Sequence, residues 1–220
     1  MDAEAEIPLS HFAAFVRQHT HDVRNDLNSL DLETALLQEL VADAEARASI
    51  ERMRAQVRAL GGRMRSLAAR FHDPQPVAAP IAASELFLIW NEQHGGLQNP
   101  PETQWVNELG AEQVNVDAGM MATVFRELLE NAGTFSQAGT TIASARREGD
   151  DAVFELREPK TGPLDPSAWG EPLATTRRGG YGLGLWSARR LLDANDARIT
   201  QRYMAEERAL VTRVLLPIRK

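Results

Sequence analysis

Apolar and small residues recur with a helical period through the first 72 residues. Two series step alternately by four and three residues, the spacing of a seam along a packed helix. The register breaks around "DAEARAS", residues 43 to 49, which predicts a turn between two antiparallel helices. The first seam comprises Val16, Thr20, Val23, Leu27, Leu30, Thr34, Leu37 and Val41, and the second Ile50, Met53, Val57, Leu60, Met64, Leu67 and Phe71.

A single helical hairpin cannot bury two such seams well. Two hairpins from two chains can bury them in a four-helix bundle. The length and regularity of the seams therefore predict a homodimer through residues 9 to 72. The alternative is that the hairpin packs on the remainder of its own chain.

The pattern changes after "HDPQPVAAP", residues 72 to 80, whose three prolines predict a linker. Three later segments have helical character: "ELFLIWNEQ", "AGMMATVFRELLENAGTF" and "LGLWSARRLLDAN". Strands are expected in "TQWVNEL", "EQVNVD", "TTIASARRE", "DAVFELRE", "ARITQRYM" and "RALVTRVLLPI", with a hairpin turn around Gly149 and Asp150.

These elements predict an α+β protein. Residues 1–73 form the dimerising hairpin, residues 74–80 the linker, and residues 81–220 an α/β sandwich with a mixed sheet and helices on one face. "EPKTGPLDPSAWGEPLATTRRGG", residues 158 to 180, is rich in proline and glycine and is expected to be a long loop.

Composition excludes several classes of function. The chain has 220 residues, 43% of them hydrophobic, a net charge of −7 and no cysteine. An acidic chain argues against nucleic-acid binding, and the lack of cysteine excludes disulfides and cysteine-zinc sites. No apolar run reaches the roughly 18 residues of a membrane span, and "MDAEAEIPLS" lacks signal-peptide character, so no membrane insertion and a cytoplasmic location are expected.

A glycine-rich segment, "RRGGYGLGLWSARRLL", leads directly into an amphipathic helix at residues 177 to 192. Glycine allows the backbone to approach a ligand closely, and the N-terminus of a helix favours an anion. The segment therefore predicts a phosphate site. It lacks the lysine of a Walker loop, and the simpler interpretation is a helix that begins after a loop.

"FRELLENAGTFS", residues 125 to 136, places two polar residues on one helix face. Glu127 and Asn131 are one turn apart, and their oxygens are ligands of the kind that Mg²⁺ prefers. The alternative for this pair alone is a solvated helix face.

Together, "ELLENA" and "GYGLGL" resemble motifs of the ATP-binding domain of sensor histidine kinases, which is related to that of gyrase and Hsp90. The resemblance covers essentially the whole chain and implies ATP and Mg²⁺ as ligands, with Asn131 holding the metal. The residues that it places at the nucleotide are Glu127, Asn131, Glu158, Gly162, Gly180, Gly182, Leu183, Gly184 and Leu185.

"HDVRNDL", residues 21 to 27, resembles the phosphoacceptor box of the same kinases. The resemblance implies that His21 accepts the phosphoryl group, that Asp22 orients the imidazole or takes its proton, and that Asn25 positions water. The implied partner is the receiver domain of a response regulator. The seam positions are consistent with this assignment, because His21 and Asn25 lie one helical turn apart and off the seam. His19 and His21 point about 200° apart on a helix, which excludes chelation of one metal ion.

Five positions depart from the family pattern. Glu127 stands where the family's asparagine box usually begins with an asparagine. In "REPKTG", Glu158 stands where an adenine-reading aspartate is expected, and Lys160 replaces a glycine. Thr134 replaces a basic residue, and Asp26 replaces a proline in the phosphoacceptor box.

Three hypotheses follow for a histidine protein kinase or histidine phosphotransferase. The first is ATP-dependent phosphorylation of His21 followed by transfer to a receiver aspartate. The second is an ATP-independent relay of phosphate between receivers, which the altered "REPKTG" favours and the intact "GYGLGL" opposes. The third is a dimeric scaffold that binds receivers without phosphotransfer.

Overall fold

The computed structural model describes residues 8–135, 139–163, 165–166, 170–173 and 182–219. The chain divides into two compact units, Met1–Asp73 and Pro74–Lys220. Each unit is described by itself below.

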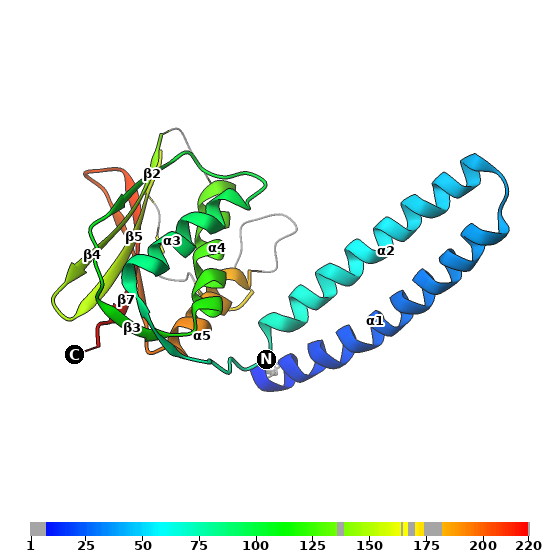
Figure 1. Ribbon diagram of the computed structural model, residues 1–220, viewed down its shortest axis with the longest axis horizontal. Helices are drawn as coiled ribbons and strands as arrows, with labels where there is room; N and C mark the ends of the chain where they lie inside the picture. The colour runs from blue at the N-terminus through cyan, green and yellow to red at the C-terminus, as the bar shows by residue number, and fades with distance from the viewer. Residues whose placement is uncertain (1–7, 136–138, 164, 167–169, 174–181, 220) are drawn as a thin grey trace, which may run out of the picture. The chain divides into compact units, whose positions relative to one another are not determined.

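The first unit is a hairpin of two long helices, α1 (Leu9–Leu40) and α2 (Ala44–Arg70), which confirms the predicted antiparallel pair (Figure 1). The turn occupies residues 41–43, so the predicted position around residues 43 to 49 was wrong. The Asp43 side chain caps α2 by accepting a hydrogen bond of 2.7 Å from the Ala46 amide. With that cap in place, the alanine, glutamate and arginine residues that follow adopt the helix that they intrinsically favour.

Side chains from both helices close the hairpin. Phe12 and Phe71 meet edge to face with ring centroids 5.7 Å apart, and Arg17 donates a hydrogen bond of 3.0 Å to the Phe71 carbonyl. Further along, the Arg54 Nε lies 3.2 Å from Asp31 Oδ1. No helix in the described part of the chain has the length and apolar character required to cross a membrane.

The hairpin buries only part of its seams. Val16, Thr20, Leu27, Thr34, Ile50 and Phe71 are buried. Four other seam residues remain nearly half exposed: Leu30 (46%), Leu37 (46%), Met53 (45%) and Leu60 (43%). A single chain therefore leaves an apolar stripe along the hairpin uncovered.

The second unit contains a five-stranded mixed sheet with α3 (Ala83–Gly95), α4 (Ala118–Thr134) and α5 (Gly184–Asp193) on one face, as predicted (Figure 1). The strand order is β2-β4-β5-β7-β6. The pair β2–β4 is parallel and the other pairs are antiparallel. The strands are β2 (Thr103–Asn107), β4 (Thr141–Glu148), β5 (Asp151–Pro159), β6 (Arg198–Met204) and β7 (Ala209–Pro217).

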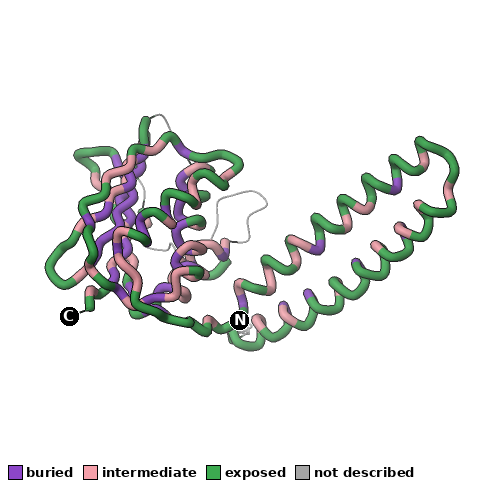
Figure 2. The backbone as a smooth tube through the Cα atoms, in the orientation of Figure 1, coloured by how far each residue is buried: buried purple, intermediate pink, exposed green. Residues whose placement is uncertain are grey.

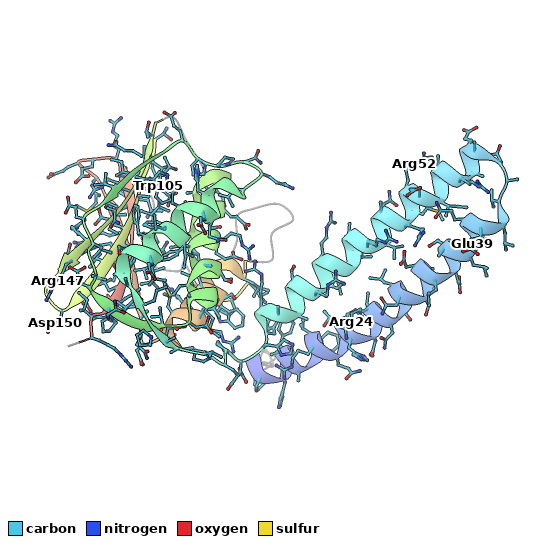
Figure 3. All side chains as sticks on the ribbon, viewed as in Figure 1. Arg24, Glu39, Arg52, Trp105, Arg147 and Asp150 are labelled. Carbon is cyan, nitrogen blue, oxygen red and sulfur yellow. The ribbon has the colours of Figure 1, made fainter. Side chains whose placement is uncertain are left out.

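The predicted hairpin between β4 and β5 is confirmed. Gly149 has a φ of +62°, a conformation that glycine adopts without strain, and Glu148 pairs with Asp151 across the turn. Figure 3 labels Arg147 and Asp150 at this end of the sheet.

A separate two-stranded sheet pairs β1 (Ala79–Ala82) with β3 (Gln113–Val116). The sequence predicted β3 but assigned the first residues of β1 to the proline-rich linker. β1 has a single strand partner, so Pro80, which has no amide hydrogen to donate, is tolerated in it.

An aromatic cluster fills the space between the main sheet and its helices. The Trp90 ring stacks on Phe125 with a centroid distance of 5.2 Å and meets Trp105 edge to face at 5.4 Å. Phe154 of β5 lies 5.3 Å from Phe125. Figure 2 shows the buried residues concentrated where helices and sheet face each other. Trp90 and Trp105 therefore serve packing.

The start of α4 yields a prediction about stability. Asp117 accepts hydrogen bonds of 2.9 Å from the amides of Met120 and Val77. These bonds, the Val77 bond most and the Met120 bond next, hold the pKa of this carboxyl below its usual value. Asp117→Ala removes both bonds and is expected to lower the free energy of unfolding by about 1–2 kcal/mol at pH 7. Because the folded-state pKa is lowered, this contribution is present above the unfolded-state value of about 3.9 and is lost as the pH falls through the folded-state value.

Urea unfolding followed by tryptophan fluorescence measures this effect, since all four tryptophans lie after residue 73. Glu92→Ala, which removes an exposed carboxylate from α3, is the control. An Asp117→Ala defect that does not shrink on acidification would contradict the prediction.

Candidate functional site

His21 projects from α1 into solvent, with a side chain that is 56% exposed. The nearby seam residues Thr20 and Leu27 are buried. The Thr20 hydroxyl donates a hydrogen bond of 2.8 Å to the Val16 carbonyl. Burial of the seam therefore fixes the rotation of α1 that exposes His21. Asn25, one turn later, is exposed as well.

Two polar side chains meet the same ring nitrogen of His21. Asp22 Oδ1 lies 3.3 Å from Nδ1, and Asn25 Nδ2 lies 3.5 Å from it. The carboxylate requires a proton on Nδ1, whereas the amide nitrogen requires a lone pair there. The Asp22 contact is shorter and involves a charge, so it favours the tautomer with the proton on Nδ1 and the lone pair on Nε2.

Gln18 holds the Asp22 carboxylate from one turn earlier. Its Nε2 donates to both carboxylate oxygens, at 2.9 and 3.2 Å. The hydrogen bond from Gln18, followed by that from His21, lowers the pKa of Asp22. The carboxylate is therefore ionised at neutral pH and oriented as a proton acceptor. Gln18 was not predicted from the sequence, although its position four residues before Asp22 on a helix was the available signal.

The glycine-rich segment supplies the start of α5. Gly182 has a φ of +63°, Leu183 is buried beneath it, and α5 begins at Gly184. Leu185 packs against the core, while Gly180 lies outside the described residues. No described side chain caps α5, and the first amide groups of such a helix can bind an anion.

The predicted metal residues lie on α4. Glu127 and Asn131 are half-buried one turn apart, at the edge of the buried stripe of that helix. Gly133 allows a close approach, because a Cβ at this position would lie 2.3 Å from the Asn99 carbonyl oxygen. α4 and α5 pack together, and the Asn195 Oδ1 after α5 accepts a hydrogen bond of 2.6 Å from the Asp117 amide before α4.

These residues suit a magnesium ion that is held mainly by phosphates. In the described part of the chain, no group of three His, Asp or Glu side chains could hold a metal ion by itself. Mg²⁺ typically keeps several waters and takes one or two protein oxygens together with phosphate oxygens. The amide oxygen of Asn131 could serve as such a protein ligand.

The segment after β5 differs from the expectation of a free base-reading carboxylate. The Lys160 Nζ donates hydrogen bonds to Glu158 Oε2 at 2.9 Å and to the Phe135 carbonyl at 3.1 Å. The Lys160 and Glu158 side chains are only 3% and 9% exposed. Burial raises the pKa of Glu158, and the ammonium of Lys160 opposes that rise. Gly162, the last glycine of the motif, is half-buried with open space around its Cα.

The sequence predicted only part of the Glu158–Lys160 arrangement. The sequence showed that Lys160 replaces a glycine, but it did not predict that Lys160 would bind Glu158. Residues two apart on an extended strand point to the same face, so the spacing of a glutamate and a lysine was the available signal.

The fold is that of known signalling enzymes. Over 93% of its length this chain superposes with ShkA, solved at full length in complex with AMPPNP, at a TM-score of 0.71 and 19% identity. The chain has the fold of a histidine kinase core. It spans 46% of the ShkA chain.

Two further solved structures share the histidine kinase fold. The mycobacterial sensor histidine kinase MprB matches 65% of this chain and 99% of its own, with a TM-score of 0.55 and 18% identity. The Acinetobacter baumannii histidine kinase AdeS matches 91% of this chain and 98% of its own, with a TM-score of 0.53 and 14% identity. No protein-family model and no curated protein matches the sequence.

The buried pair of this histidine kinase fold generates a second prediction. Lys160→Met leaves the Glu158 carboxylate buried without its partner and is expected to cost about 3–5 kcal/mol of unfolding free energy at neutral pH. The loss should shrink as the pH falls, because protonation of Glu158, whose pKa burial has raised, removes the unpaired charge.

Urea unfolding by tryptophan fluorescence measures the loss. The double variant Glu158→Gln/Lys160→Met is the matched control and should recover part of the stability, since it buries no unpaired charge. Full stability of Lys160→Met at pH 7 would contradict the geometry of the pair.

Proposed function

We propose that this chain is a histidine kinase core of two-component signalling, in which His21 accepts the γ-phosphoryl group of ATP and passes it to an aspartate of a receiver domain. The observation that carries this proposal is the exposed His21, with Asp22 and Asn25 both at Nδ1. A histidine on a solvated helix face has no structural need for two such partners.

The chemistry follows from the tautomer. The lone pair of Nε2 attacks the γ-phosphorus, so a P–N bond forms while the bond from phosphorus to the β–γ bridging oxygen breaks and ADP leaves. The imidazole becomes cationic in this step, and the proton on Nδ1 faces Asp22 at 3.3 Å. Asp22 stabilises that cation and accepts its proton. Gln18 keeps the carboxylate in place throughout.

Residues of the second unit and one structural relative support ATP as the donor. The open start of α5 at Gly182, Leu183 and Gly184 suits a phosphate chain, with Leu185 anchoring the helix. The amide oxygen of Asn131 would hold Mg²⁺, which supplies charge neutralisation for phosphoryl transfer when bound. The structural relative ShkA was solved with AMPPNP, an ATP analogue. Glu127 adds a carboxylate one turn before Asn131.

The resemblance to sensor histidine kinases also supports a receiver partner and action in the cytoplasm. Asn25 shares the exposed face of His21, so its amide reaches the same volume as the phosphorylated ring. We assign to Asn25 the positioning of the water that removes phosphate from the bound receiver.

Incubation of the full chain with γ-labelled ATP and Mg²⁺ tests the proposal. The wild type should acquire an acid-labile phosphate, and His21→Gln should acquire none. His19→Gln is a matched control, because His19 is also an exposed α1 histidine but stacks on Phe15 at 5.7 Å instead of meeting a carboxylate. Equal labelling of His21→Gln and wild type, or no labelling of the wild type together with no nucleotide binding, would overturn ATP-dependent phosphorylation.

A second candidate is an ATP-independent relay that carries phosphate between receivers through His21. The buried Glu158–Lys160 pair favours it, because Lys160 already occupies an oxygen of the expected adenine-reading carboxylate. A phosphorylated receiver offered without nucleotide would then label wild type and His19→Gln but not His21→Gln. A receiver that leaves the wild type unlabelled would exclude the relay.

The uncovered seam supports a homodimer. Leu30 and Leu37 are each 46% exposed and lie one heptad apart on one side of α1. Leu30→Asp/Leu37→Asp should shift the chain from dimer to monomer in sedimentation velocity, because two buried unpaired charges disfavour a bundle core strongly. Leu32→Asp/Leu36→Asp, at exposed positions off the seam, is the control and should leave the dimer intact. A wild type that sediments as a monomer would contradict the predicted bundle.

A further inference from the structure

Polar side chains at heptad spacing form interhelical pairs along the hairpin. Gln38 Nε2 donates a hydrogen bond of 3.2 Å to Glu51 Oε2. Seven residues earlier on α1 and seven later on α2, Arg58 Nε lies 3.4 Å from Asp31 Oδ1. Residues seven apart share a helix face, so these are successive pairs between the same two faces. Both pairs join groups that attract each other.

The next interhelical pair brings together two cations. A further heptad step leads to Arg24 on α1 and Arg65 on α2, which are both exposed. The step after that joins attracting groups again, because Arg17 donates a hydrogen bond of 3.0 Å to the Phe71 carbonyl. No hydrogen bond or ion pair joins Arg24 or Arg65 to any other described residue. Two like charges at the same level of the hairpin repel each other and therefore attract an anion.

The carboxylates on this part of α1 do not supply that anion. Asp31 already binds arginines of α2. Asp22 is held by Gln18 at 2.9 Å. Asp26 is two residues after Arg24, and residues at that spacing on a helix do not face each other. The anion that fits this pair must therefore come from a ligand or from a modified residue.

His21 lies beside the cationic pair. It is three residues before Arg24, a spacing that makes side chains neighbours on a helix surface. Long side chains on a helix lean toward its N-terminus, so Arg24 extends over the turn that carries the imidazole. The Arg65 guanidinium lies along α2, 3.7 and 3.9 Å from where a Cβ on Gly61 and on Gly62 would be. The two glycines leave open space beside this guanidinium.

We infer that Arg24 and Arg65 form a phosphate clamp, which binds the oxygens of the phosphoryl group at His21 during transfer and in the phosphohistidine. The inference rests on the proposed function, in that His21 carries phosphate. It applies to either donor, because ATP and a phosphorylated receiver deliver the same phosphoryl group. A guanidinium binds phosphate oxygens through two parallel hydrogen bonds. The phosphoryl group brings close to two negative charges, which neutralise the two arginines.

Initial rates of His21 labelling by γ-labelled ATP, and separately by a phosphorylated receiver, test the phosphate clamp. With whichever donor labels the wild type, Arg24→Gln/Arg65→Gln should label at least about tenfold more slowly, because arginine contacts stabilise the charge on a transferring phosphoryl group. Arg24→Lys/Arg65→Lys should recover part of the rate, since lysine keeps the charge but loses the planar fork.

The control variant Arg52→Gln/Arg202→Gln removes two exposed arginines at other places and should label at the wild-type rate. Figure 3 labels Arg24 on α1 and Arg52 on α2. Equal labelling rates of Arg24→Gln/Arg65→Gln and the wild type overturn the phosphate clamp and leave phosphorylation of His21 standing.

Phosphoramidate phosphorylates imidazole without nucleotide or receiver and gives a second measurement. The ³¹P signal of phosphorylated His21 is assigned by its absence from His21→Gln. Its phosphate pKa should be at least about half a pH unit lower in the wild type than in Arg24→Gln/Arg65→Gln, because nearby cations favour the dianion. Identical titration curves overturn the phosphate clamp. Absence of label on His21 with ATP, receiver and phosphoramidate alike overturns the clamp together with the proposed function.

Discussion

Every helix that carries a candidate site residue must bury one apolar stripe, and this constraint determines which polar side chains reach the surface. On α1, burial of Thr20 and Leu27 rotates His21 outward. On α4, burial of Leu128 and Ala132 leaves Glu127 and Asn131 half-exposed at the edge of the buried stripe. The candidate site residues therefore lie on helix faces that are not buried in the core.

The same constraint explains the division between structural and reactive residues around Trp90. The ring contacts of Trp90 with Trp105 and Phe125 are buried and hold α3 and α4 against the sheet. This rigid layer fixes the position of α4, and α5, which begins at Gly184, packs beside it. The end of β5 completes the second unit with the Glu158–Lys160 pair.

Periodic segments were predictable from the sequence because the spacing of apolar residues follows directly from helix and strand geometry. The seams of α1 and α2, the strand β5 and the exposed direction of His21 all follow from that spacing. The predicted position of the turn, which lies at residues 41–43, was wrong because the cap by Asp43 depends on one side chain and not on the spacing of apolar residues. β1 was missed because Pro80 argues against a strand unless its single-partner position is known.

The partners of individual polar atoms were less predictable. The sequence placed Glu158 and Lys160 two residues apart, yet their bond depends on how deeply both side chains are buried. The Phe135 carbonyl, which follows α4, joins them only in the folded chain. Such contacts between distant segments leave no pattern in the local sequence. They change the hydrogen bonding of the "REPKTG" motif relative to the family motif that it resembles.

The central claim is that His21 is the phosphorylated residue, and site mapping tests it most directly. The full chain is incubated with MgATP, and separately with a phosphorylated receiver, and is then analysed by tandem mass spectrometry under conditions that preserve phosphohistidine. The account predicts phosphate on His21 from at least one donor and none on His19. Phosphate on another residue, or no phosphohistidine with either donor, would contradict it.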